Sequence, residues 1–238
     1  MSPVSVTRLV VEGIELARGE LVVPPPAARH ARVARVGAGE PVEVLDLAGR
    51  VGVGRLLAWE RGACRVAIES VVHERGEPPK PLRLALAVLH TSAFDWAVEK
   101  ATELGATEIF PVVSDLVQGG KHVARVQRWR RVAVAAVAQC GRSRAPVVCE
   151  PCRLADLLVS ARGSRLVADA EAADTPPPVV GGEGITVLVG PEGGFANDEL
   201  AAIRAAGFRS LPLGPRTLRA ETAAVAALAV VQDRLGWR

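Results

Sequence analysis

The stretch Ile185–Phe195, which reads Ile-Thr-Val-Leu-Val-Gly-Pro-Glu-Gly-Gly-Phe, passes from a short apolar run straight into a glycine-rich turn. The stretch Leu211–Gly214, Leu-Pro-Leu-Gly, repeats this change further along the chain. A short apolar run bounded by turn residues favours a buried strand. Glycine has no Cβ, so the backbone of such a turn can approach a ligand closely. The sequence therefore predicts two glycine-rich loops that leave two strands and contact one flat ligand.

Strand-like and helix-like patterns alternate from Leu82 to the C-terminus. Ser92 with Asp95 resembles a capping box that opens the first helix, and Asn197 is a favourable N-cap for the fourth. Such alternation predicts an α/β domain with a mostly parallel sheet, whose ligands bind beyond the carboxyl ends of the strands. The expected strands are 82–89, 108–113, 146–149, 164–168, 185–189 and 208–213, and the expected helices are 92–104, 122–140, 154–161, 197–206 and 219–235.

Residues 1–73 show another pattern, of short strands separated by proline and glycine. Alternating pairs such as Val42 with Val44 indicate strands with one buried face, and the whole stretch predicts a small domain of the β-barrel type. The polar, proline-rich residues 74–81 are typical of a linker. The expected organisation is thus a front domain over 1–73, a linker over 74–81 and an α/β domain over 82–238.

Charge is distributed unevenly, although the net charge of the 238 residues is only +3. Between Lys121 and Arg144 there are seven basic side chains and no acidic one. Such a run suits a polyanion, and its alternative interpretation is a solvated helix face. With eight aromatic residues in the chain, base stacking is not expected to dominate any contact with nucleic acid.

The N-terminal residues lack the continuous apolar segment of a secretory signal, and no apolar run is long enough for a transmembrane helix. We therefore expect a cytoplasmic protein without a membrane partner. Cys149-Glu-Pro-Cys152 has the spacing of a redox pair or of half a zinc site. No second pair of this kind exists and the four histidines are scattered, so we expect packing roles for these thiols and no metal.

The glycine-rich turns match neither of two familiar nucleotide-binding motifs. Gly190–Gly194 lacks the spacing of a dinucleotide fingerprint, and no Gly-Lys-Ser/Thr follows it as in a phosphate-binding loop. In the second segment, Arg219 and Glu221 stand at the start of an Ala/Val-rich helix, near Arg216 and Thr222. Charges at the mouth of a buried helix are costly unless they are used or paired. They belong to a site, or they form an Arg–Glu pair that caps the helix.

Four blocks taken together resemble the 16S rRNA uridine-N3 methyltransferases of the SPOUT superfamily. The blocks are the two glycine-rich segments, Glu99–Ala106 (Glu-Lys-Ala-Thr-Glu-Leu-Gly-Ala) and Gln139–Pro146 (Gln-Cys-Gly-Arg-Ser-Arg-Ala-Pro), and the resemblance covers most of residues 83–235. His90 stands where the family often has a charged turn, and Ala138 where many members have Glu. The front stretch His30-Ala-Arg-Val-Ala-Arg-Val is similar to the family's PUA-like RNA-binding domain.

The resemblance implies a C-terminal trefoil knot, S-adenosylmethionine as the methyl donor, and a homodimer that acts on small-subunit ribosomal RNA or on the assembled subunit. Such knots are very rare, and periodicity alone does not predict them. Carried over by position, the residues that bind the cofactor are Gly190, Glu192, Gly193, Gly194, Leu213, Gly214, Leu218, Arg219, Ala220 and Thr222.

The hypothesis for the reaction is methyl transfer to N3 of a uridine, which must lose its proton. Arg219 is expected to stabilise the negative charge on the uracil, and Glu221 is a candidate base or a structural partner. The alternatives are a SPOUT enzyme for another base or for the ribose 2′-OH, a non-catalytic RNA assembly factor and, more weakly, a nucleotide hydrolase. Phosphate contacts are expected from Arg8, Arg32, Arg35, Arg128, Arg131, Arg142 and Arg144.

Overall fold

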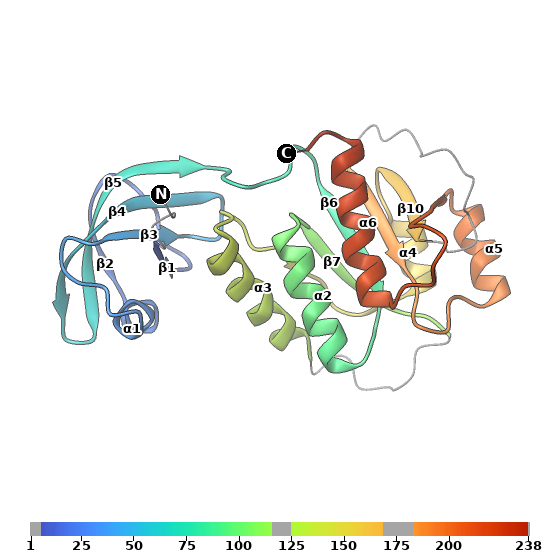
Figure 1. Ribbon diagram of the computed structural model, residues 1–238, viewed down its shortest axis with the longest axis horizontal. Coiled ribbons are helices and arrows are strands. Elements are labelled where there is room, and N and C mark those ends of the chain that lie inside the picture. Colours follow the sequence, from blue (N-terminus) through green and yellow to red (C-terminus); the bar gives the residue numbers. More distant parts are fainter. Residues whose placement is uncertain (1–5, 116–124, 169–182, 238) are drawn as a thin grey trace. The chain divides into compact units, whose positions relative to one another are not determined.

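The structure is a computed structural model that describes residues 6–115, 125–168 and 183–237 (Figure 1). The chain divides into two compact units. The front unit comprises Met1–Glu77 with Val137–Ala145, and the second unit comprises Pro78–Ala136 with Pro146–Arg238. The expected linear boundary assigned residues 137–145 to the second domain, whereas these residues pack within the front unit. Lys121, His122 and most of the loop over 171–184 lie outside the described residues.

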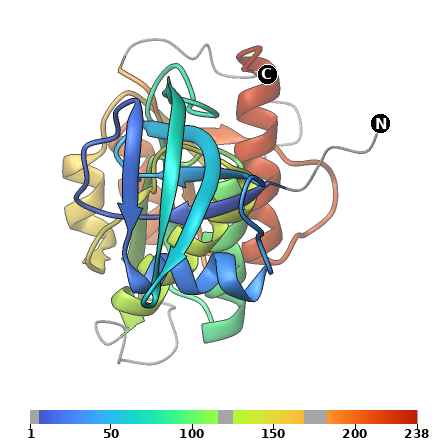
Figure 2. The ribbon, with the colours of Figure 1, turned by 90° about the vertical axis from the view of Figure 1, so that its left-hand side faces the viewer.

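The front unit is a five-stranded sheet with one helix (Figure 2). The strands lie in the order β1-β3-β4-β5-β2, and only β1 and β3 are parallel. The proline-rich stretch that was expected only to separate strands instead begins helix α1, because proline fits the first turn of a helix. The bounds are β1 Thr7–Val10, β2 Gly19–Val23, α1 Pro25–Val33, β3 Pro41–Leu45, β4 Arg50–Glu60 and β5 Ala63–His73.

The second unit is built on a seven-stranded sheet in which every observed pairing is parallel. The order is β12-β10-β11-β6-β7-β8, and β9 also pairs with β7. The bounds are β6 Leu82–Ala87, α2 Thr91–Glu103, β7 Glu108–Val113, α3 Val126–Cys140, β8 Val147–Val148, β9 Cys152–Arg153, α4 Leu154–Ser160, β10 Ser164–Ala168, β11 Ile185–Val189, α5 Asn197–Ala205, β12 Arg209–Leu211 and α6 Ala220–Arg234. The predicted α/β domain with a mostly parallel sheet is confirmed.

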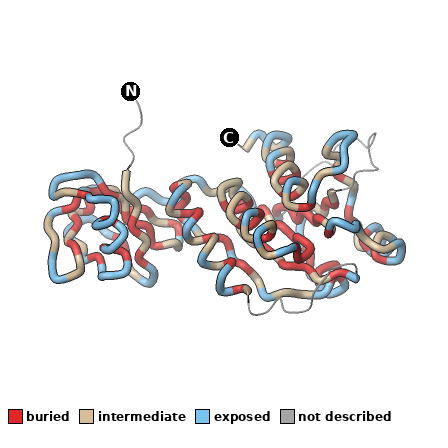
Figure 3. The backbone as a smooth tube through the Cα atoms, turned by 60° about the horizontal axis from the view of Figure 1, so that its bottom comes forward, coloured by how far each residue is buried: buried red, intermediate tan, exposed pale blue. Residues whose placement is uncertain are grey.

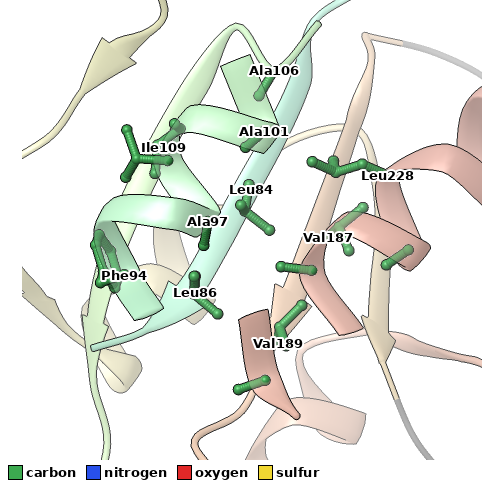
Figure 4. Packing of buried hydrophobic residues seen from close by; sticks show 14 of the residues in the cluster. Leu84, Leu86, Phe94, Ala97, Ala101, Ala106, Ile109, Val187, Val189 and Leu228 are labelled. Carbon is green, nitrogen blue, oxygen red and sulfur yellow. The ribbon is translucent and has the colours of Figure 1, made fainter. Parts of the chain in front are cut away.

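Helices cover both faces of this sheet. Leu84 and Leu86 of β6 pack with α2, α3 and α6, while the intervening Ala85 packs with α4 and α5. In the same way Val187 faces the first layer and Leu188 the second. Figure 4 shows side chains of the first layer, which include Leu84, Leu86 and Val187. Figure 3 colours the chain by how far each residue is buried. Successive strand residues point to opposite faces, which is why these strands are apolar throughout.

The direction in which strands are added reverses between β6 and β11, which are neighbours at the centre of the sheet. β7 and β8 extend the sheet on one side of this pair, and β10 and β12 extend it on the other. At such a switch point the loops leave the two strands in opposite directions and open a crevice at their carboxyl ends. The loop from β6 to α2 and the glycine-rich loop after β11 both begin at this point.

Two predicted helix caps are wrong. Helix α2 begins at Thr91 after His90, so Ser92 is not its N-cap, and Asp95 instead accepts a hydrogen bond from Arg128. Asn197 is the first residue of α5 and not its cap. The carboxylate of Glu199 secures that end by accepting the backbone N–H of Ala196 at 2.9 Å. Among the helices that the structure describes, none is long and apolar enough to cross a membrane.

Candidate functional site

A cavity of ≈ 670 Å³ lies at the carboxyl end of the central strands. Residues of both glycine-rich segments line this cavity, since Glu192 follows β11 and Arg219 stands directly before α6. Helix α6 reaches this place by packing on β11, β6 and α2 (Figure 1). Helix α2 contributes Ser92, Ala93 and Trp96 to the lining. The lining residues are His90, Ser92, Ala93, Trp96, Glu192, Arg219, Glu221 and Thr222. The structure thus brings together four of the predicted site residues.

The glycines of both loops leave the backbone open to a ligand. Gly194 has φ +73° and Gly214 has φ +104°, and a Cβ built on either would meet no atom within 4 Å. Other residue types rarely adopt this left-handed backbone, so glycine is required at both positions. At Gly190 a Cβ would come within 2.9 Å of the Phe195 ring, which packs over the turn. These loops can therefore hold a flat ligand against exposed backbone.

Arg219 and Glu221 are placed by the start of α6. Arg219 is the N-cap residue and its carbonyl accepts the N–H of Ala223 at 2.8 Å, while its side chain makes no capping bond. Glu221 lies in the first helical turn, where the helix dipole favours a carboxylate. Within the described part of the chain neither side chain forms an ion pair, so the alternative of an Arg219–Glu221 cap is not observed.

The other predicted cofactor residues belong to the same loops but do not line the cavity. Leu213 and Leu218 are half-buried, Gly193 is exposed, and Ala220 is buried beneath the first turn of α6. Sequence reasoning did not include His90, Ser92 and Trp96 in the site. The signal that could have found His90 and Ser92 is their position shortly after the apolar strand that became β6, whereas Trp96 lies further along, within α2.

The basic run between residues 121 and 144 is largely neutralised by acids from other parts of the chain. Arg128 pairs with Asp95 at 2.7 Å, and Arg130 pairs with Glu150 at 3.0 Å. Arg144 pairs with Glu74, and the hydrogen bond from its guanidinium holds the pKa of that carboxyl below its usual value. Arg131 donates to the carbonyl of Gln127 in its own helix. The run contains no acidic residue along the sequence, but in the folded chain carboxylates from other segments lie beside most of its arginines.

Arg142 has a structural role, which corrects the prediction of a phosphate contact. Its side chain is 4 % exposed and its Nη2 lies 2.6 Å from the carboxylate of Glu77, which is 6 % exposed. Glu77 also accepts the backbone N–H groups of Ser143 and Arg144, at 3.1 and 2.8 Å. The stretch 74–77, expected to be a free linker, is thus bonded to the segment Val137–Ala145 of the front unit.

Arg8 is also committed to internal contacts. Its guanidinium donates to Glu43 at 3.0 Å and to the carbonyls of Ala138 and Gln139 at 3.2 and 2.6 Å. Arg75 makes two further bonds to Glu43, and these bonds are the main reason that the pKa of Glu43 lies below its usual value. Arg8 therefore connects the front sheet to the end of α3, and the expected phosphate contact is corrected here as well.

Helix α1 and the turn directly after it carry basic side chains of a different kind, which have no carboxylate partner among the described residues. Arg32 and Arg35 are exposed, and in the described part of the chain neither forms an ion pair. The Arg32 guanidinium lies 4.8 Å from the ring centroid of Trp59, which orients it without neutralising it. Arg29, which the sequence analysis omitted, is exposed on the same helix.

The surroundings of Cys149 and Cys152 disfavour the thiolate form. Burial raises the pKa of Cys149 to about 11, and burial also raises the pKa of Cys152. A protonated thiol is a poor nucleophile and a poor metal ligand. No three His, Cys, Asp or Glu side chains converge on a metal-sized site within the ranges that the structure describes.

Comparisons with known proteins agree with this arrangement. A family model described as an RNA methyltransferase domain matches residues 76–232. The chain is 32 % identical over 215 residues to the ribosomal RNA small subunit methyltransferase E of Mycobacterium bovis, covering 84 % of this chain and 81 % of the relative. It is 30 % identical over 212 residues to the Synechocystis protein of the same name, covering 86 % and 69 %.

Two solved structures are similar over nearly the whole chain. A ribosomal RNA small subunit methyltransferase E from Neisseria gonorrhoeae, bound to S-adenosyl methionine, matches with a TM-score of 0.87 and 28 % identity, covering 96 % of this chain and 98 % of that one. A Legionella pneumophila protein in complex with SAM matches with a TM-score of 0.84 and 28 % identity, covering 97 % and 98 %.

Proposed function

The chain belongs to the RNA methyltransferase family, and on this premise we propose that it transfers the methyl group of S-adenosylmethionine to N3 of a uridine in small-subunit ribosomal RNA. The observation that carries the proposal is one cavity lined by charged residues of both glycine-rich segments. Glu192 comes from the first segment, and Arg219 and Glu221 come from the second. In an otherwise heavily paired molecule, these charges have no internal partner among the described residues. They are therefore available to the reactants.

The glycine-rich loops fit the cofactor. Their backbone is open at Gly194 and Gly214, where a side chain would occupy the space above the loop. Half-buried Leu213 and Leu218 offer apolar surface, and the carboxylate of Glu192 offers a charge opposite to that of a sulfonium or an ammonium group. S-adenosylmethionine supplies an electrophilic methyl group when bound. The neighbours from Neisseria gonorrhoeae and Legionella pneumophila, both solved with this cofactor, support the assignment.

The chemistry at the acceptor is assigned to Arg219 and Glu221. Uridine N3 carries a proton, and its removal leaves negative charge on the uracil ring. The Arg219 guanidinium, exposed at the cavity, stabilises that charge as it develops. The Glu221 carboxylate, in the first turn of α6, lines the same cavity and accepts the proton. The cavity walls hold the two reactants together and so lower the entropy cost of their encounter.

Phosphate contacts are assigned to the predicted arginines that remain exposed. These are Arg32 on α1, Arg35 just after α1, and Arg128 and Arg131 on α3. Arg144 is also exposed, but its guanidinium is bonded to Glu74, so a phosphate would have to compete with that carboxylate. RNA binding that depends on such contacts weakens steeply as salt concentration rises.

The resemblance extends the proposal to a knotted C-terminal fold, a PUA-like front unit, a homodimer and a cytoplasmic location. The path of the chain supports the knot, because β12 is an edge strand while α6 packs on the central strands. Residues 212–219 therefore return across the carboxyl ends of the sheet. The five-stranded sheet with α1 supports an RNA-binding front unit. Light scattering in solution tests whether the protein is a dimer.

The test is transfer of tritiated methyl from S-adenosylmethionine to RNA, with free ribosomal RNA and small subunits from cells lacking the protein compared as substrates. Digestion to nucleosides and mass spectrometry identify the product. We expect 3-methyluridine alone. A 2′-O-methyl nucleoside or another methylated base would favour a related RNA methyltransferase. The absence of transfer, together with calorimetry showing no cofactor binding, would favour a non-catalytic assembly factor.

A further inference from the structure

A second cavity, of ≈ 580 Å³, adjoins the one that contains Arg219 and Glu221. His90, Ser92 and Trp96 line both, so the two cavities meet at the first turns of α2. Helix α2 lies between α6 and α3, since it packs on α6 along its length and Phe94 contacts Trp129 of α3 at 4.3 Å between ring centroids. The remaining lining residues of the second cavity are Thr91, Asp95, Glu99, Arg128 and Val132.

The side chain of Trp96 lines both cavities. The indole is 41 % exposed, whereas its neighbours Phe94, Ala97 and Val98 are fully buried in the core. Trp96 therefore stands on the open side of α2 and is not needed to fill the core. A large flat apolar ring that lines an open cavity offers one surface suited to a flat ligand.

Arg128 lines the second cavity, and only one of its guanidinium nitrogens, Nε, donates a hydrogen bond among the described residues. Its Nε donates to Oδ2 of Asp95 at 2.7 Å, and the side chain is 59 % exposed. No hydrogen bond from its two terminal nitrogens is found within the ranges that the structure describes. Asp95 thus orients the guanidinium, while its fork of N–H groups remains open to the oxygens of a phosphate.

We propose that the target uracil stacks on the indole of Trp96, and that Arg128 binds a phosphate of the adjoining nucleotide. This inference rests on the proposed function. Uridine N3 lies on the Watson–Crick edge, so the base must leave its pair and lose its stacking before it can react. An aromatic side chain replaces that stacking for any base. The acceptor must also share a cavity with Arg219 and Glu221, and Trp96 lines that cavity.

The decisive variants are Trp96→Ala and Trp96→Phe, with Val159→Ala as the control. Val159 is an apolar side chain that is 88 % exposed on α4, in the opposite helical layer. Substrate saturation curves are measured with small subunits from cells lacking the protein, and calorimetry gives the affinity for S-adenosylmethionine. We expect kcat/KM for the RNA to fall about 10- to 100-fold in Trp96→Ala, as for loss of one base–aromatic stack. Trp96→Phe should recover most of it, and cofactor affinity should stay within about twofold.

Arg128→Gln tests the second part of the proposal. Loss of one phosphate contact should raise KM by a few fold and reduce the slope of log affinity against log salt by about one. An unchanged salt slope would remove Arg128 from the binding surface. An unchanged kcat/KM in Trp96→Ala would overturn the stacking proposal. Two other results would also overturn it: an equal loss of cofactor affinity, which would place Trp96 at the cofactor, or dissociation of a dimer in light scattering, which would place a second copy on it.

Photo-cross-linking separates this inference from the proposed function, because it does not require turnover. Small-subunit RNA transcribed with 5-bromouridine is irradiated in complex with the wild-type chain, and mass spectrometry locates the adducts. An adduct on Trp96 supports stacking even if the wild-type chain methylates no RNA. Adducts confined to other residues, in a chain that does produce 3-methyluridine, would contradict the role of Trp96 and leave the proposed function intact.

Discussion

Two groups of charged residues in this protein look alike along the sequence and differ in space. Most arginines of α3 and the following loop pair with a carboxylate from elsewhere, as Arg142 pairs with Glu77 and Arg144 with Glu74. Arg219 and Glu221, at the mouth of α6, form no ion pair within the described ranges and line a cavity. A high density of charge along the chain therefore does not locate a binding surface. The absence of an internal partner, combined with a cavity, is the better guide.

Burial explains the difference. Arg142 is 4 % exposed, and a buried charge is tolerated only when a partner and hydrogen bonds replace its water. Arg219 is exposed, so solvent stabilises it until a ligand arrives. The buried pair of Arg142 and Glu77 maintains the fold, whereas the exposed Arg219 is free to act on reactants. The following variants test that division.

Arg219→Ala should have the largest effect, on catalysis alone. We expect kcat for methyl transfer to fall about 1,000-fold, or about 4 kcal/mol in activation free energy, because one donor to the developing charge is lost. The melting temperature should stay within a few degrees, since no internal ion pair is broken. Arg216→Ala is the matched control, because Arg216 is exposed in the same loop but does not line the cavity. Near-normal turnover in Arg219→Ala would remove this residue from the mechanism.

Glu77→Gln should have the next largest effect, on stability. The substitution leaves the buried Arg142 guanidinium without its counter-charge, and we expect the free energy of unfolding to fall by about 3 kcal/mol in urea titrations. Glu74→Gln breaks an exposed pair and should cost no more than about 1 kcal/mol. Equal losses in the two variants would show that burial does not decide the role of these pairs.

Glu43 should make the stability of the front unit depend on pH. Bonds from Arg75 and Arg8 hold its pKa below the usual 4.5. Its contribution to stability is therefore fully present above pH 4.5 and is lost as pH falls through the lower folded-state pKa. Glu43→Gln should cost about 1.5 kcal/mol at pH 7, and this difference from wild type should shrink steadily on acidification below pH 4.5. A difference that is constant from pH 7 to pH 3 would argue against the assignment.

Arg32 of α1 and Arg35, just after this helix, should show the smallest effect, on RNA affinity. The double variant Arg32→Gln with Arg35→Gln should weaken binding of small-subunit RNA about 5- to 10-fold at 0.15 M salt and should flatten the salt dependence. Turnover at saturating RNA should not change, because neither residue lines the cavity. Binding measured by fluorescence anisotropy across a salt series provides the test. Affinity equal to wild type at every salt concentration would contradict the assignment.

The sequence predicted much of the second unit because its strands are bounded by glycine, proline and polar residues. The strand Ile185–Val189 matches β11 residue for residue, and the helix expected over 219–235 matches α6, Ala220–Arg234, to within one residue at each end. Helix starts were less predictable. Glu199 secures α5 by reaching back to Ala196 and also accepts the N–H of Asp115, a contact between distant segments that no local pattern encodes.

The candidate site was only partly accessible from the sequence. Glu192, Arg219, Glu221 and Thr222 could be predicted because motifs mark both glycine-rich loops. Trp96 could not, because its place beside these loops depends on the order of the strands, with β6 next to β11. The role of Arg142 in the basic run was mistaken for a related reason. Its carboxylate partner, Glu77, lies far away along the chain, so an acid-free stretch looked unpaired.

The most direct test of the account is a crystal structure of the protein with S-adenosylhomocysteine, the product left by the methyl donor. The account predicts that the ligand contacts the backbone of both glycine-rich segments, around Gly194 and Gly214, with Arg219 and Glu221 facing the same cavity. A ligand bound at another place, or glycine-rich segments too far apart to contact it together, would contradict the account.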